Sequence, residues 1–288
     1  QPMSSAATIY LGLDVHKDSV TIAVLPSSAL APTRVDKLPN DLAKIRRFCE
    51  RQASQGTVCA CYEASGAGYV IQRAMAAWGY HCDVIAPSLI PTKPGQQRKH
   101  DTADAIQLAR LYRAGELTIV RIPTEAEERV RDVVRCRETF QREVLRSRHY
   151  ILKFLARRGF VYREGCNWRQ AHYEWLRQLA RADSPLAAED RRVFGEYLGL
   201  LEYKLSRRDA LDEQIEALAL TPALASAVAT LQCFRGIQQQ AAMVLATEIS
   251  DWQRFASPRQ LMAYLGLVPR EHSSGDRERR GSITKAGN

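Results

Sequence analysis

The fold of the first part of this chain is decided by TIYLGLDVHKDSVTIAVL, residues Thr8–Leu25. Two runs of apolar, β-favouring residues flank a short polar stretch at 16–19, and this pattern predicts a β-hairpin. Asp14 stands at the end of the first run, where a strand can present its carboxylate to a ligand. An aspartate that merely forms the turn would explain Asp14 alone equally well, so its role depends on what else converges there.

A second strand that ends in an acid follows further along. The strand predicted at Thr57–Tyr62 leads directly into Glu63, and the loop after Glu63 opens a helix predicted over Tyr69–Trp78. An edge strand, a helix that Asn40 caps and a further strand are also predicted. This order of strands and helices indicates a three-layer α/β domain that resembles the ribonuclease H fold. A glycine-rich phosphate loop does not follow the first strand, which counts against a dinucleotide site. The remaining predicted elements are the edge strand Arg34–Leu38, the helix after Asn40 and the strand His81–Ala86.

Two more acids open the next helix. Asp101 and Asp104 are three residues apart, so they share one helix face. Either acid alone would suit the positive end of the helix dipole, but that explains two acids less well. Converging carboxylates repel one another unless a hard cation neutralises them, and Mg²⁺ prefers such oxygen ligands. The four acids therefore predict a Mg²⁺ site for phosphodiester chemistry: Asp14, Glu63, Asp101 and Asp104.

Long helical patterns dominate the middle of the chain. Apolar residues recur at helical spacing over Glu125–Gly159 and again over about Ala187–Leu220, and stripes of this length predict a coiled coil or a long helical hairpin. Arginines cover the other faces of the first helix. They either pair with neighbouring glutamates or bind nucleic-acid phosphates, and the sequence leaves both interpretations open. Aromatic residues between the two helices, Trp168, Tyr173 and Trp175, fit packing against the hairpin better than base stacking.

The last section is mainly helical and ends in a basic, glycine-rich segment. A helix, a Gly-Ile turn at 236–237 and another helix resemble the start of a helix-hairpin-helix module, although Gln238 replaces the usual second glycine. Residues 266–288 are polar and predict a mobile functional loop. The predicted domains are thus 1–122, 123–221 and 222–288.

Composition indicates a partner of negative charge. Lys and Arg total 41 against 32 acids, which gives a net charge of +9 over 288 residues, so a polyanion is the natural partner. The 7 cysteines are scattered without a CxxC pair, which favours a reducing cytoplasm over a disulfide framework or a zinc site. An apolar run of transmembrane length is not found.

Five sequence segments together resemble one family. They are GLDVHK at 12–17, YEASGAG at 62–68, KHDTADA at 99–105, GLVPREHSSG at 266–275 and RRGSITKAGN at 279–288. In this order they are similar to the insertion sequence 110 family of DEDD transposases. The resemblance covers nearly the whole chain and implies a RuvC-like nuclease domain, a coiled-coil segment that supports dimers or tetramers, and a C-terminal transposase domain.

The resemblance also implies partners and site residues. A bridge RNA transcribed from the element would pair with donor and target DNA, and the four acids would hold Mg²⁺. The nucleophile would be Ser274, with the adjacent Ser273 as its competitor; turn hydrogen bonds are the structural alternative for both. The family continues into a further helix beyond Asn288, so we expect this chain to be a truncated form. Candidates to grip the flanking phosphates are Arg270, Arg277, Arg279, Arg280 and Lys285.

Two other functions stay open at this point. A RuvC-type nuclease would hydrolyse branched DNA with Mg²⁺ and the four acids, leaving Ser274 structural. A non-catalytic RNA-binding scaffold would use the arginine-rich helices instead. A covalent protein–DNA adduct separates the recombinase from both.

Overall fold

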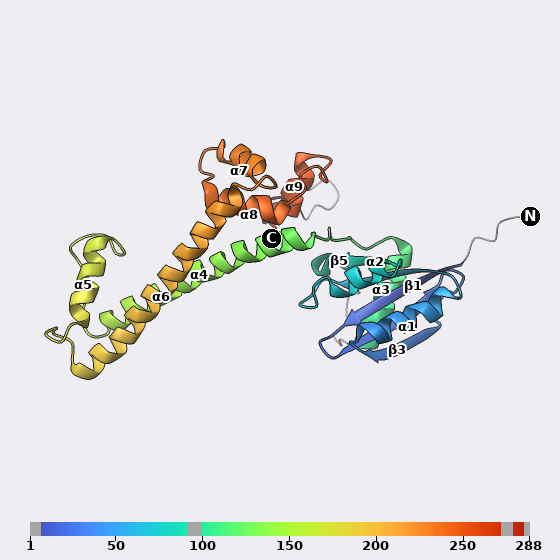
Figure 1. The fold of residues 1–288 in the computed structure, drawn as a ribbon, viewed down its shortest axis with the longest axis horizontal. Helices are drawn as coiled ribbons and strands as arrows, with labels where there is room; N and C mark the ends of the chain where they lie inside the picture. The colour runs from blue at the N-terminus through green and yellow to red at the C-terminus, as the bar shows by residue number, and fades with distance from the viewer. Residues whose placement is uncertain (1–6, 92–99, 272–278, 285–288) are drawn as a thin grey trace, which may run out of the picture. The chain divides into compact units, whose positions relative to one another are not determined.

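The structure is a computed structural model that describes residues 7–91, 100–271 and 279–284. It divides into two compact units, residues 1–122 and residues 123–288. The first unit holds a mixed β-sheet with helices on both faces, and the second is mainly helical (Figure 1).

The sheet of the first unit has five strands in the order β3-β2-β1-β4-β5. β1 is central: it pairs antiparallel with β2 and parallel with β4. The predicted hairpin and the predicted edge strand β3 are therefore confirmed, and the mixed α/β class is consistent with a RuvC-like domain. The strands are β1 Thr8–Val15, β2 Ser19–Pro26, β3 Arg34–Pro39, β4 Thr57–Glu63 and β5 His81–Ile85.

Helices α1 (Leu42–Ala53) and α2 (Val70–Ala77) cover one face of this sheet, because their apolar residues join the same buried cluster as Leu11, Leu13 and Ile22. α3 (Asp101–Ala114) covers the other face. A short 3₁₀ helix, Pro87–Leu89, follows β5.

The prediction that Asn40 caps α1 was wrong by one residue. The side chain of Asp41 accepts the hydrogen bond from the backbone N–H of Lys44, as an N-cap aspartate does. Asn40 instead donates to the backbone carbonyl of His16 at 2.8 Å. It thereby ties the end of β3 to the β1–β2 turn.

Two antiparallel helices of 32 residues form the long axis of the second unit (Figure 1). α4 (Glu125–Ala156) starts with a capping box between Thr124 and Glu127, and α6 (Ala188–Ala219) packs back along it. Such a pair is the helical hairpin that the apolar stripes predicted. The other helices are α5 Gln170–Ala180, α7 Ala225–Gln232, α8 Gln239–Ile249 and α9 Pro258–Tyr264.

Most α4 arginines pair within the second unit. Arg137 bonds Asp212 of α6 at 2.7 Å, and Arg135 bonds Glu248 of α8 at 2.7 Å. Arg148 donates to the Tyr173 hydroxyl and lies 5.0 Å from the centre of the Trp168 ring. These contacts favour the structural role for those arginines, and the aromatic residues pack against the hairpin as expected.

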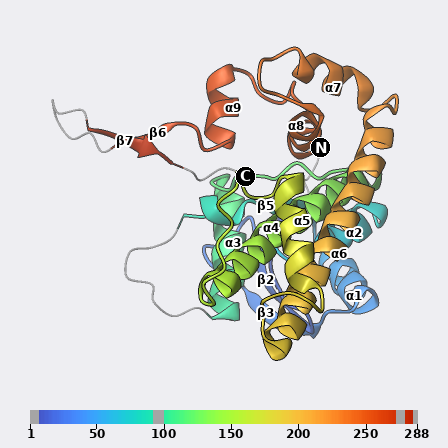
Figure 2. The ribbon, with the colours of Figure 1, turned by 90° about the vertical axis from the view of Figure 1, so that its left-hand side faces the viewer.

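Within the segment predicted as a mobile loop, the described residues include two short strands. β6 (Pro269–Glu271) pairs antiparallel with β7 (Arg280–Ile283) in a small two-stranded sheet (Figure 2). The short strands escaped the sequence analysis because they lack an alternating apolar pattern. Within the described part of the chain, none of the helices combines the length and apolar character needed to cross a membrane.

Candidate functional site

The carboxylates of Asp14 and Asp101 come together where α3 meets the carboxyl end of β1. Gly12 makes this approach possible: a Cβ there would lie 2.3 Å from the Ala105 carbonyl oxygen and 2.4 Å from the Ala109 nitrogen. Asp14 lies two residues after Gly12 on the same strand, so it faces α3 as well. Its side chain is 17% exposed.

Glu63 reaches the same row of the sheet through the parallel pairing of β1 with β4. Leu13 is in register with Tyr62, so Asp14 and Glu63 follow at the same level and on the same face. The parallel strands β1 and β4 thus each carry one acid near their carboxyl ends.

The first turn of α3 supplies the other two acids. His100 caps this helix, and Asp101 and Asp104 both lie in its first turn. The Asp101 carboxylate, the Asp14 carboxylate and a ring nitrogen of His16 all lie within 4.8 Å of one another. His16 Nε2 is 3.0 Å from Asp14 Oδ2 and 3.5 Å from Asp101 Oδ1.

Charge and burial act on the two aspartates in opposite directions. Burial raises the pKa of Asp14, and the charges of Asp101 and Asp104 raise it further, while His16 lowers it. The hydrogen bond from Lys37 lowers the pKa of Asp101. Of these two aspartates, Asp14 is therefore the one whose charged form burial disfavours and a nearby positive charge would stabilise.

Comparison with known proteins identifies the family. Residues 11–159 match the DEDD transposase family of IS110 elements, and residues 228–288 match the family described as Transposase IS116/IS110/IS902 family. The chain belongs to the IS110 family of transposases. It is thus a DNA transposase, an enzyme of insertion sequences.

Individual relatives agree with this membership. The chain is 37% identical over 281 residues to "Putative transposase y4qE" of Sinorhizobium fredii, an alignment that covers 97% of this chain and 68% of the relative. It is 30% identical to the transposase for insertion sequence element IS1533 of Leptospira borgpetersenii, over 87% of this chain and 72% of the relative. It is 25% identical to the transposase for insertion sequence element IS1111A of Coxiella burnetii, over 96% of this chain and 73% of the relative.

The DEDD domain of this transposase suggests a divalent metal, and the donors at the site suit one. Two carboxylates and an imidazole converge, and carboxylate oxygens are preferred by hard divalent cations. The Thr21 hydroxyl on the adjacent strand β2 is buried and has no hydrogen-bond partner among the residues that the structure describes. Polar groups left unsatisfied in this way often mark a place where an ion or water binds.

Two residues of this cluster, His16 and Lys37, were not among the site residues predicted from the sequence. His16 follows Asp14 by two positions, so strand alternation places both on one face. Lys37 bonds Asp101 at 2.9 Å although 64 residues separate them. The signal for His16 was thus available in the sequence, whereas that for Lys37 required the register of β2 with β3.

The predicted residues of the second unit are only partly described. Arg270 donates to the Thr284 carbonyl at 3.4 Å, and the exposed Arg279 precedes β7. Four other predicted residues lie outside the described part of the structure: Ser273, Ser274, Arg277 and Lys285. The side chain of Arg280 is not described either.

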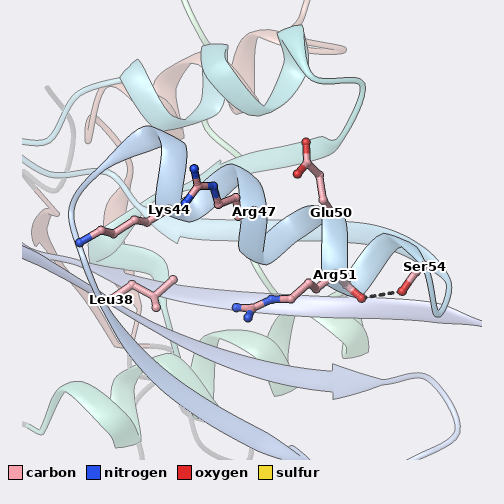
Figure 3. Close-up of a pocket in the computed structure, with 6 residues that line it drawn as sticks. All are labelled: Leu38, Lys44, Arg47, Glu50, Arg51 and Ser54. Carbon is pink, nitrogen blue, oxygen red and sulfur yellow. Dashed lines mark hydrogen bonds between the residues drawn. The ribbon is translucent and has the colours of Figure 1, made fainter.

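A separate surface depression lies between α1 and β3 (Figure 3), lined by Leu38, Lys44, Arg47, Glu50, Arg51 and Ser54. Leu38 follows Lys37 on β3 and points to the opposite face of the sheet, where it packs against the core beneath α1. The depression is therefore on the other side of the sheet from the acids.

Proposed function

We propose that this transposase cuts and rejoins DNA strands with Mg²⁺ held by Asp14, Glu63, Asp101 and Asp104. The observation that carries the proposal is the closeness of Asp14 on β1 and Asp101 on α3, which lie near enough to share one cation. Glu63 lies at the end of the neighbouring parallel strand β4. Bound Mg²⁺ would stabilise the negative charge that develops on the phosphate under attack.

The proposed nucleophile is Ser274. Its Oγ attacks the phosphorus of the scissile phosphodiester, a new Oγ–P bond forms, and the P–O bond to the leaving sugar hydroxyl breaks. The proton lost from the serine is balanced by the proton that the leaving oxygen gains. A serine hydroxyl needs activation for such an attack, and the acid cluster provides the negative groups that accept a proton or orient the cation.

The two parts of this site come from different units of the chain. The acids belong to residues 1–122 and Ser274 to residues 123–288, so the active site must be assembled, within one chain or between copies of a homo-oligomer. Basic residues close to Ser274 in the sequence, such as Arg270 and Arg279, would hold the flanking phosphates. The family resemblance supports a bridge RNA that selects donor and target DNA.

An adduct assay tests this proposal. The full-length protein is incubated with Mg²⁺, its guide RNA and end-labelled target DNA, and protein–DNA species that survive denaturation are counted on a gel. We expect an adduct in the wild type and in Ser273→Ala, and its loss in Ser274→Ala and in Asp14→Asn.

The other outcomes identify the competing functions. Mg²⁺-dependent cutting without any adduct would replace the recombinase with a hydrolytic RuvC-type nuclease. RNA binding without any cutting would indicate a non-catalytic scaffold. Loss of the adduct in Ser273→Ala alone would move the nucleophile by one residue.

A further inference from the structure

A row of three side chains crosses the sheet beside the acid cluster. Asp14 of β1 is paired with Thr21 of β2, and Thr21 is paired with Lys37 of β3. Paired residues of neighbouring strands point to the same face, so all three side chains face the side that α3 covers. Lys37 therefore stands on the edge strand, two strand spacings from Asp14.

Lys37 reaches across this row to the acids. Its Nζ donates to Asp101 Oδ2 at 2.9 Å, while Asp101 Oδ1 lies 3.5 Å from His16 Nε2. Only a long side chain can span the distance from β3 to the first turn of α3. Among the described side chains that contact Asp14 or Asp101, Lys37 provides the ammonium group, and His16 is charged only when protonated.

A lysine on an edge strand usually has another purpose. Edge strands carry lysines whose solvated charge blocks pairing with another chain. Such a lysine gains nothing from turning inward, since an exposed ion pair contributes little stability. The Lys37 side chain is 60% exposed and still lies against Asp101, which places its charge where a cation and a phosphate must both arrive if the proposed function holds.

We propose that Lys37 is a positioning residue of the transposase site, which holds Asp101 in the free protein and offers its ammonium group to the DNA phosphate. The inference rests on the proposed function. It has two consequences of opposite sign. The ammonium group repels a divalent cation that binds Asp101, and it attracts the phosphate that is cut.

The test measures these two effects separately in the full-length protein. Binding of Mn²⁺ alone is measured by calorimetry without DNA, and DNA cutting is measured at saturating Mg²⁺. In Lys37→Met we expect Mn²⁺ to bind roughly fivefold more tightly, the scale of one exposed charge interaction, and cutting to slow at least tenfold. Lys37→Arg keeps the charge and should stay close to the wild type in Mn²⁺ affinity.

A matched control removes an equal charge elsewhere in the unit. Lys44 is exposed on α1 on the other side of the sheet, and Lys44→Met should leave the Mn²⁺ affinity unchanged. If Lys37 served only to stabilise the structure, Lys37→Met should bind Mn²⁺ more weakly and have a lower melting temperature.

Each of the remaining outcomes would overturn one part of the proposal. If Asp101→Asn weakens Mn²⁺ binding but Lys37→Met does not strengthen it, Lys37 does not compete with the cation, and this inference fails while the metal site stands. If Lys37→Met binds Mn²⁺ more tightly and cuts as fast as the wild type, the role toward phosphate fails. If the wild type binds Mn²⁺ no better than Asp14→Asn and Asp101→Asn, the metal site of the proposed function fails first.

Discussion

Gly12 determines how closely α3 can approach β1. A methyl group at this position would enter backbone atoms of Ala105 and Ala109, which cannot move aside as a flexible side chain can. Gly12→Ala should therefore push α3 from the sheet and separate Asp101 from Asp14. We expect a loss of about 1–3 kcal/mol in unfolding free energy, as for other overpacked cores, and weaker Mn²⁺ binding by calorimetry.

The control for this prediction is Gly66→Ala. A Cβ at Gly66 would meet nothing within 4 Å, so both stability and Mn²⁺ affinity should stay close to those of the wild type. Unchanged Mn²⁺ affinity in Gly12→Ala would mean that the position of α3 does not govern the acid cluster.

His172 makes the second unit sensitive to acid. Its ring is fully buried against Trp168 and Trp175, and Nδ1 accepts the backbone N–H of Trp168 at 3.0 Å. Burial lowers the pKa of His172, and the charge of Arg148 lowers it further. Below about pH 6.5, the ordinary pKa of histidine, the unfolded chain therefore binds a proton that the folded chain does not, and stability falls with falling pH.

We expect the unfolding free energy, measured in urea between pH 7.5 and pH 5, to decrease with a slope of at most about 1.4 kcal/mol per pH unit from this one group. His172→Phe should be less stable at pH 7.5 and show a flatter pH profile. His149→Gln, at an exposed position of α4, should keep the wild-type slope. An equal slope in His172→Phe would show that other groups cause the acid sensitivity.

At the scale of elements, much of the architecture followed from local sequence patterns. The β1–β2 hairpin, the edge strand and the two long helices were predicted because alternation and helical spacing are properties of short windows. The acids at 14, 63, 101 and 104 could be placed at strand ends and at a helix start for the same reason. The order of elements indicated a three-layer α/β domain, but the parallel pairing of β1 with β4, which places Asp14 and Glu63 on neighbouring strands, came from the structure.

Contacts that depend on register could not be predicted in this way. The row Asp14–Thr21–Lys37 exists because two hairpins are in a particular register, and shifting either by one residue would turn Lys37 to the other face. The short strands β6 and β7 are set by pairing with each other rather than by their own composition. In both cases the structure depends on how two strands pair, which the sequence of one strand alone does not reveal.

The α4–α6 hairpin contains an ion pair whose loss should be costly. Arg137 has a side chain only 15% exposed, and Asp212 bonds both Arg137 and Gln240 of α8, each at 2.7 Å. Asp212→Ala leaves a largely buried guanidinium without this partner, so we expect a loss of about 2 kcal/mol, between the values for exposed and fully buried pairs. Glu213→Ala, at an exposed neighbouring position, should change the urea midpoint little. An equal loss in Glu213→Ala would show that the effect is not specific to the Arg137–Asp212 pair.

At the scale of the whole molecule, the division into residues 1–122 and 123–288 has a thermodynamic consequence. Each unit has buried clusters of its own, around Leu11, Leu13 and Ile22 in the first and around Phe154 and Phe194 in the second. Chains with separate cores commonly unfold in more than one step. We therefore expect two transitions in scanning calorimetry, which substitutions in the two units shift independently.

Gly12→Ala should lower the melting temperature of one transition, and Asp212→Ala should lower that of the other. In the proposed site Mn²⁺ binds residues of the first unit, and a ligand stabilises the part of the molecule that binds it. Mn²⁺ should therefore raise the melting temperature of only the transition whose melting temperature Gly12→Ala lowers. A single transition moved by both substitutions and by Mn²⁺ would mean that the two units unfold as one. In that case the acids and the segment that carries Ser274 would be energetically coupled before DNA binds. Two independent transitions would instead mean that the two units are not energetically coupled before DNA binds.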